Sequence, residues 1–157
     1  MTLNTASEVI SLSRKLEEES KSFYQALAQR HPELSEHFLS FAKENEKYTR
    51  EVERVYYGVI TDALEGGFTF RIEPGDYRIS TKLQEEISLA RAIGTAIKME
   101  EKLQKFYMYS AKQSKSLMAD IPRAFAQIVR KRQNRIEELR AMVVMNLNRH
   151  EFRSSVY

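Results

Sequence analysis

The chain contains few residues that interrupt a helix, and their placement constrains the fold more than any other feature. Only five Gly and three Pro occur among its 157 residues. A helix interior tolerates Gly and Pro least, so the long stretches between them favour helices. Six of these eight residues lie at the breaks Pro32, Gly66-Gly67, Pro74-Gly75 and Pro122. The breaks therefore divide the chain into four long segments.

Each of the four segments is predicted to be a helix. The helices are expected over about residues 5–30, 32–64, 81–115 and 120–148, with a crossover over residues 65–80. Capping residues support three of the four starts. Thr5 with Glu8 and Thr81 with Gln84 have the spacing of a capping box, and Asp120 is a favourable N-cap.

The lengths of the connections predict the topology. Short links join the first helix to the second and the third to the fourth, so each pair is expected to be an antiparallel hairpin. Helices of this length are about 40 Å long, and the long middle segment can cross that distance. The predicted fold is all-α: a four-helix bundle of two antiparallel hairpins joined by a long crossover.

Composition limits the class of protein. A hydrophobic fraction of 42% can supply the core of one domain over residues 1–157. No run reaches the ~20 apolar residues of a membrane span, and the start, MTLNTASEV, lacks the pattern of a secretion signal. The absence of Cys excludes disulfides, thiolate metal ligands and a cysteine nucleophile. We expect a cytoplasmic protein without a membrane partner.

The two halves of the sequence resemble each other. LEEESKSFYQALA, Leu16 to Ala28, aligns without gaps with MEEKLQKFYMYSA, Met99 to Ala111. FLSFAKENEKY, which begins at Phe38, aligns with FAQIVRKRQNR, which begins at Phe125. The repeat indicates that each half is one helical hairpin packed on its twin.

These repeated motifs resemble a known family. A glutamate followed by Phe-Tyr six residues later, then an F-x-x-φ-A segment in the next helix, is similar to the rubrerythrin-like branch of the ferritin-like superfamily. The resemblance covers roughly residues 5–147. It implies that each half supplies one glutamate from its first helix and an E-x-x-H pair from its second. In that family, six such side chains hold two irons.

The chain departs from the family at most of the implied ligand positions. Glu17 and Glu100 stand where the resemblance places the two glutamates of the first and third helices. The four E-x-x-H positions carry Asn45, Tyr48, Arg132 and Arg135 instead. None of the three histidines lies at these positions. The di-iron ligand set is therefore degenerate, and no metal or other cofactor is expected.

Two arginines on an apolar helical stripe require a structural explanation. Arg132 and Arg135 fall between Ile128 and Leu139 on the inward face of the fourth helix. Two buried carboxylates without a counterion would be costly, so we expect the guanidinium groups to pair with the two glutamates. The hydrogen-bond network is expected to be completed by Asn45, Tyr48, Tyr24 and Tyr107.

The leading hypothesis for function is a non-enzymatic structural or interaction role. A homodimer is expected by analogy with ferritin-like bundles, together with a protein partner that the sequence does not identify. One alternative is a rubrerythrin-like di-iron or single-metal oxidoreductase, or an iron-binding protein. Its non-standard site would use Glu17, Glu100 and a neighbour such as Glu44.

A second alternative is an anion- or nucleic-acid-binding module. It would use the basic residues of the fourth helix, including Arg130 and Lys131. No aromatic side chains alternate with these basic residues, as a single-strand binding platform would need. We therefore expect Arg130 and Lys131 to be solvated, and nucleic acid is the less favoured partner.

Overall fold

The computed structural model describes residues 1–59, 70–80, 82–85, 87–115 and 119–156, the last ten as backbone only. The described chain is all-helical, with four long helices and no strand. These are α1 (Ala6–Arg30), α2 (Ser35–Val59), α4 (Leu89–Gln113) and α5 (Asp120–Val156). Two short 3-10 helices, η1 (Pro32–Leu34) and η2 (Pro74–Tyr77), lie in the connections.

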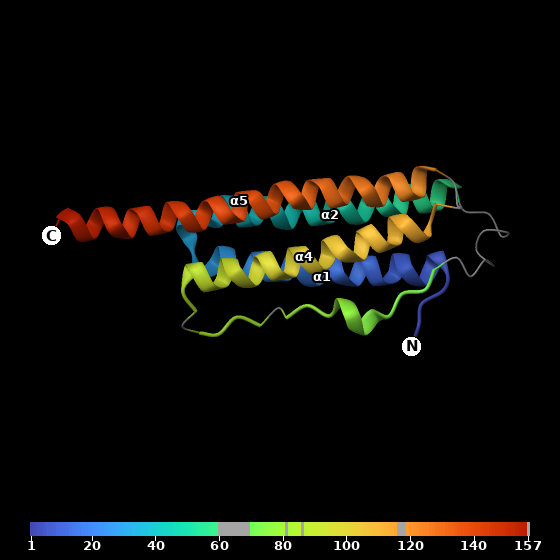
Figure 1. Ribbon diagram of the computed structural model, residues 1–157, viewed down its shortest axis with the longest axis horizontal. Coiled ribbons are helices and arrows are strands. Elements are labelled where there is room, and N and C mark those ends of the chain that lie inside the picture. The colour runs from blue at the N-terminus through green and yellow to red at the C-terminus, as the bar shows by residue number, and fades with distance from the viewer. Residues whose placement is uncertain (60–69, 81, 86, 116–118, 157) are drawn as a thin grey trace.

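The helices form a bundle of two layers (Figure 1). α1 pairs with α2 and α4 pairs with α5, each as an antiparallel hairpin. α1 lies against α4 in one layer and α2 against α5 in the other, so that every helix has two neighbours. The crossover runs back along the α1 and α4 layer for most of the bundle's length. The predicted pair of hairpins and the long crossover are present.

The start of α1 is the capping box that the sequence predicted. The Thr5 side chain accepts a 3.2 Å hydrogen bond from the Glu8 N–H, and the Thr5 N–H donates at 3.2 Å to the Glu8 carboxylate. Two N–H groups that the helix cannot satisfy internally are thereby paired.

The predicted start of the third helix at residue 81 is wrong. Thr81 itself lies outside the described residues, but residues 82–85 and 87–88 are not helical and α4 begins at Leu89. Ser88 is the N-cap, and its side chain accepts a 3.2 Å hydrogen bond from the Arg91 N–H. Ser is among the most favourable N-cap residues, and the sequence analysis considered only Thr81 as the start.

Contacts from the end of α1 hold part of the segment before α4. The Arg30 guanidinium donates to the main-chain oxygen of Leu83 at 3.2 Å and also to that of Gln84. The Gln84 oxygen also accepts a 3.3 Å hydrogen bond from the Ile87 N–H. The segment before α4 is thus held to the end of α1 as an extension of the crossover.

Two other predicted boundaries also differ. The second helix was expected over residues 32–64, but residues 32–34 form a 3-10 turn, α2 ends at Val59, and residues 60–64 lie outside the described part. The fourth helix was expected to end near residue 148 and continues to Val156. No Gly or Pro follows Pro122, so the sequence contains no strong stop signal for α5.

The crossover is fixed to the bundle at its described start. Leu3 and Ile72 form an isolated antiparallel bridge with hydrogen bonds of 2.7 and 3.0 Å. The amide of Gln113 pairs with both main-chain groups of Arg71, at 3.0 and 3.1 Å. Farther along, the Tyr77 ring packs edge-on against a core phenylalanine of α4. The segment is therefore a packed part of the fold.

No helix in the described part of the chain has the length and apolar character needed to cross a membrane.

Candidate functional site

Two glutamates lie at the centre of the bundle. Glu17 is in the middle of α1 and Glu100 in the middle of α4, and their residues are 1% and 0% exposed. Their neighbours one turn away on the same stripe, Ser13 and Leu103, are also buried. The helical periodicity that buries the apolar stripe therefore buries these carboxylates as well.

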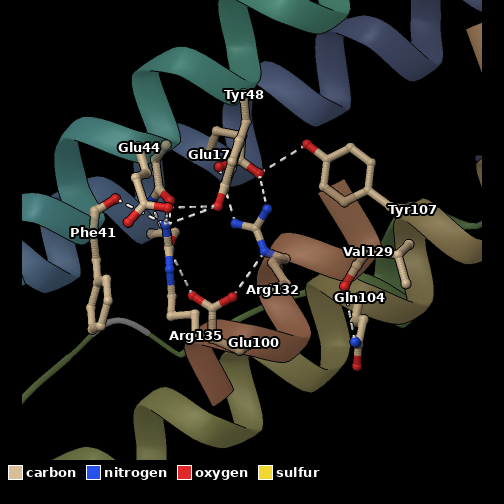
Figure 2. Close-up of polar contacts among 12 residues, drawn as sticks. Glu17, Phe41, Glu44, Tyr48, Glu100, Gln104, Tyr107, Val129, Arg132 and Arg135 are labelled. Carbon is tan, nitrogen blue, oxygen red and sulfur yellow. Dashed lines mark hydrogen bonds and ion pairs between the residues drawn. The ribbon is translucent and has the colours of Figure 1, made fainter. Parts of the chain in front are cut away.

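Arg132 of α5 joins the two glutamates (Figure 2). Its Nη1 and Nη2 donate to the two oxygens of Glu17 at 2.6 and 3.0 Å. Its Nε donates to Oε2 of Glu100 at 2.9 Å. A planar guanidinium can make a bidentate pair and a further bond at once, which an ammonium cannot. The predicted pairing of this arginine with both glutamates is confirmed.

Arg135 lies one turn farther along α5 and completes the charge balance. Its Nη1 donates to Oε1 of Glu100 at 3.0 Å and to Oδ1 of Asn45 at 2.7 Å. Its Nη2 donates to the main-chain oxygen of Phe41 at 3.1 Å and to the Tyr48 hydroxyl at 3.5 Å. Asn45 and Tyr48 thus connect α2 to the network, as expected.

Two buried tyrosines complete the shell of the carboxylates. The Tyr107 hydroxyl donates to Glu17 at 2.9 Å and the Tyr24 hydroxyl donates to Glu100 at 2.6 Å. The rings also face the cations, because the Arg132 guanidinium carbon is 5.5 Å from the Tyr107 ring centre. The Arg135 guanidinium carbon is 5.3 Å from that of Tyr24. Aromatic faces stabilise a desolvated guanidinium.

Sequence reasoning assigned no role to two serines of α1 that belong to the network. Ser20 accepts a 2.8 Å hydrogen bond from Nδ2 of Asn45, and Ser13 bonds to the Tyr107 hydroxyl at 2.8 Å. Both serines lie within one turn of Glu17 on its buried face. Small polar residues flanking a buried glutamate at helical spacing were the signal that could have identified them.

One edge of the cluster reaches solvent at α2. The side chain of Glu44 is 38% exposed, and its Oε2 lies 3.9 Å from Nη2 of Arg135. Glu44 also accepts a 3.1 Å hydrogen bond from the Tyr48 hydroxyl. Arg130 and Lys131 are exposed on the outside of α5, as predicted. The basic residues of this helix therefore divide into a solvated pair and an internal pair.

The electrostatics of the cluster favour its charged form. Burial by itself would raise the pKa of Glu100, but the charges of Arg132 and Arg135 outweigh burial and lower that pKa. Burial and the neighbouring carboxylates raise the pKa of Tyr24 and Tyr107 well above the ordinary value. The glutamate is therefore ionised and the phenols are neutral at physiological pH.

The arrangement leaves little capacity for a metal ion. All four oxygens of Glu17 and Glu100 accept hydrogen bonds from guanidinium groups. Within the described residues, no three His, Asp or Glu side chains gather closely enough to hold a metal ion. Nε of Arg135 has no hydrogen-bond partner, but it is a donor and cannot ligate a cation.

Comparison with known proteins identified no relative of this chain. No protein-family model matches the chain, and neither a curated protein nor a solved structure gives a significant match. The fold and the site define a four-helix bundle with a buried cluster of glutamate and arginine at its centre.

Proposed function

We propose that the chain is a ferritin-like protein of the rubrerythrin-like type in which an internal salt-bridge cluster replaces the di-iron centre. Its role is then structural, or depends on contacts at its surface, and is not oxidoreductase chemistry. The observation that carries this proposal is the position of Arg132. Its guanidinium occupies the space between Glu17 and Glu100 and bonds to both.

The internal symmetry of the site supports a ferritin-like origin. Glu17 and Glu100 come from the first helix of each hairpin, and they face residues of the second helices. These residues are spaced i and i+3, which places both on one helical face. They are the pairs Asn45 with Tyr48 and Arg132 with Arg135.

The residues present do not fit an iron site. Iron sites of this type need several carboxylates and imidazoles around each ion. Here two permanent cations stand at ligand positions, and the two remaining carboxylates are already neutralised by them. An incoming cation would have to displace a bidentate guanidinium from a fully buried pair.

Four groups of the cluster are poorly suited to acid–base chemistry near neutral pH. An effective general base or acid has a pKa near the working pH. The pKa of Glu100 lies below its ordinary value, while burial raises the pKa of Tyr48, Tyr24 and Tyr107 above theirs. These shifts move each group away from neutrality, which supports a structural role.

Iron loading tests the proposal. Protein purified without chelator or tag is incubated anaerobically with Fe(II), desalted and analysed for metal. We expect far less than one iron per chain, because the cluster is already charge-balanced. Stoichiometric iron with peroxide consumption would overturn the proposal and favour the oxidoreductase.

A restored variant tests the ferritin-like assignment separately. It returns the four family positions to E-x-x-H, through the changes Asn45→Glu, Tyr48→His, Arg132→Glu and Arg135→His. We expect this variant to take up iron under the conditions in which the wild type does not. A variant that keeps its helical circular dichroism but binds no iron would contradict the assignment.

A further inference from the structure

A large cavity lies away from the buried cluster. It is an open groove of about 980 Å³ between the outer face of α4 and described residues of the crossover, namely Asp76, Tyr77, Ile79, Ser80, Lys82, Gln84 and Ile87. Five cationic side chains line it, against the two carboxylates Asp76 and Glu101. The cations are Lys82, Arg91, Lys98, Lys102 and Lys105. The resulting charge of +3 equals the formal net charge of the whole chain.

The cations of the groove are available to a partner. All five are exposed, and none has an ion pair within the described part of the chain. Lys102 alone makes a polar contact, a 2.7 Å hydrogen bond from Nζ to the main-chain oxygen of Arg78. Among the lysines of the described part, Lys21 of α1 does have ion pairs, the closer one to Glu46 at 2.9 Å.

The cations form a line of defined length. Arg91, Lys98, Lys102 and Lys105 follow one another at spacings of 7, 4 and 3 residues, which places them on one face of α4. The line extends for about 21 Å at 1.5 Å per residue. An extended peptide covers this length with about six residues, and every second side chain would point at the helix.

We propose that this groove binds an extended acidic segment of a partner protein. Carboxylates at alternate positions of the segment would pair with the lysines of α4. Apolar side chains between them would point the other way, toward the partly exposed Ile79 and Ile87 of the crossover. The main-chain groups of Ile79 and Ser80 make no internal hydrogen bond in the described part and can pair with the segment's backbone.

The lining favours an acidic peptide over a nucleic acid. Single-stranded nucleic acid is bound through exposed aromatic side chains on which bases stack. The aromatic residue of this groove, Tyr77, is only 9% exposed and packs on Phe106 with ring centres 5.4 Å apart.

Fluorescence anisotropy at low salt tests this proposal. The probes are a fluorescein-labelled peptide in which Glu alternates with Val and a labelled oligothymidine of equal charge. The groove variant carries Lys98→Glu, Lys102→Glu and Lys105→Glu. The control carries Lys43→Glu, Lys47→Glu and Arg50→Glu, which have the same spacing on the exposed face of α2.

We expect the wild type and the control to bind the peptide and the groove variant to bind it at least about tenfold more weakly. Binding should weaken as salt rises. Absence of peptide binding by the wild type, or equal losses in both variants, would overturn the proposal. Binding of oligothymidine without binding of the peptide would also overturn it, in favour of nucleic acid. Circular dichroism establishes that both variants are folded.

Discussion

Tyr24 and Glu100 come from different halves of the sequence repeat, yet they share a 2.6 Å hydrogen bond at the centre of the bundle. The equivalent hydrogen bond runs in the opposite direction: Tyr107 of the second half donates to Glu17 of the first at 2.9 Å. Each hairpin therefore donates a hydrogen bond to the buried carboxylate of the other, and Glu17 also takes its counterion, Arg132, from the second hairpin. The two halves depend on each other for a satisfied core, and neither hairpin should be stable alone.

Removing either tyrosine hydroxyl should weaken the fold to a similar extent. Tyr24→Phe and Tyr107→Phe each delete one hydrogen bond to a buried carboxylate, a loss of about 1.5–3 kcal/mol in the free energy of unfolding. Tyr107→Phe also removes the bond to Ser13, so its loss should lie toward the upper end of this range. Urea unfolding of each variant measures the loss. Tyr109→Phe is the control, because Tyr109 is exposed on the same helix as Tyr107. If the free energy of unfolding of Tyr24→Phe or Tyr107→Phe equals that of the wild type, the deleted hydrogen bond contributes nothing to stability.

Loss of the bridging arginine should have a larger effect. Arg132→Ala removes every guanidinium bond to Glu17 and one of those to Glu100. A buried carboxylate left without its counterion costs about 3–5 kcal/mol. Chemical denaturation followed by circular dichroism gives the change in stability. Arg130→Ala, on the exposed side of α5, should change stability by no more than about 0.5 kcal/mol. If Arg132→Ala and Arg130→Ala unfold at the same denaturant concentration, Arg132 does not stabilise the fold through this network.

The partners in the cluster were predictable because helical periodicity and charge balance both restrict them. Glu17 and Arg132 lie on apolar stripes of different helices, so burial of both stripes brings opposite charges into one dry space. The roles of Ser13 and Ser20 were not foreseen, since serine on a helix can equally bond to its own main chain.

Features that depend on tertiary contact were less accessible to sequence reasoning. Thr81 and Ser88 are both favourable N-cap residues by local chemistry, and α4 begins after the later one, where Arg30 of α1 contacts the preceding segment. The basic groove was likewise missed, because the stripe Lys98, Lys102 and Lys105 becomes one wall of a cavity only when the crossover packs beside it. Sequence spacing does not reveal that placement.

Acid should destabilise the protein through Glu100. Its pKa is lowered in the folded state, so its contribution to stability is present above the unfolded-state value of about 4.3. That contribution is lost as the pH falls through the lowered folded-state pKa. The slope of unfolding free energy against pH should therefore be smaller in Glu100→Gln than in the wild type. Glu101→Gln, an exposed neighbour, should keep the wild-type slope, and a Glu100→Gln variant that also keeps it would contradict the linkage.

An entirely apolar centre should be at least as stable as the native one. Pairing in a buried cluster offsets the desolvation of its charges without exceeding it by much, so well-packed apolar replacements are neutral or more stable by about 1–4 kcal/mol. The variant combines Glu17→Leu, Tyr24→Phe, Asn45→Leu, Glu100→Leu, Tyr107→Phe, Arg132→Met and Arg135→Met.

The matched control for this variant carries only Glu17→Leu and Glu100→Leu. It leaves Arg132 and Arg135 buried without counterions, so it should be less stable than the wild type by about 3–5 kcal/mol. Denaturant unfolding of both proteins compares them directly. If the apolar variant is as unstable as the control, the polar network itself stabilises the fold. If it is as stable as the wild type, the charges at the centre persist for a reason other than stability, as replacement of an ancestral metal site would provide.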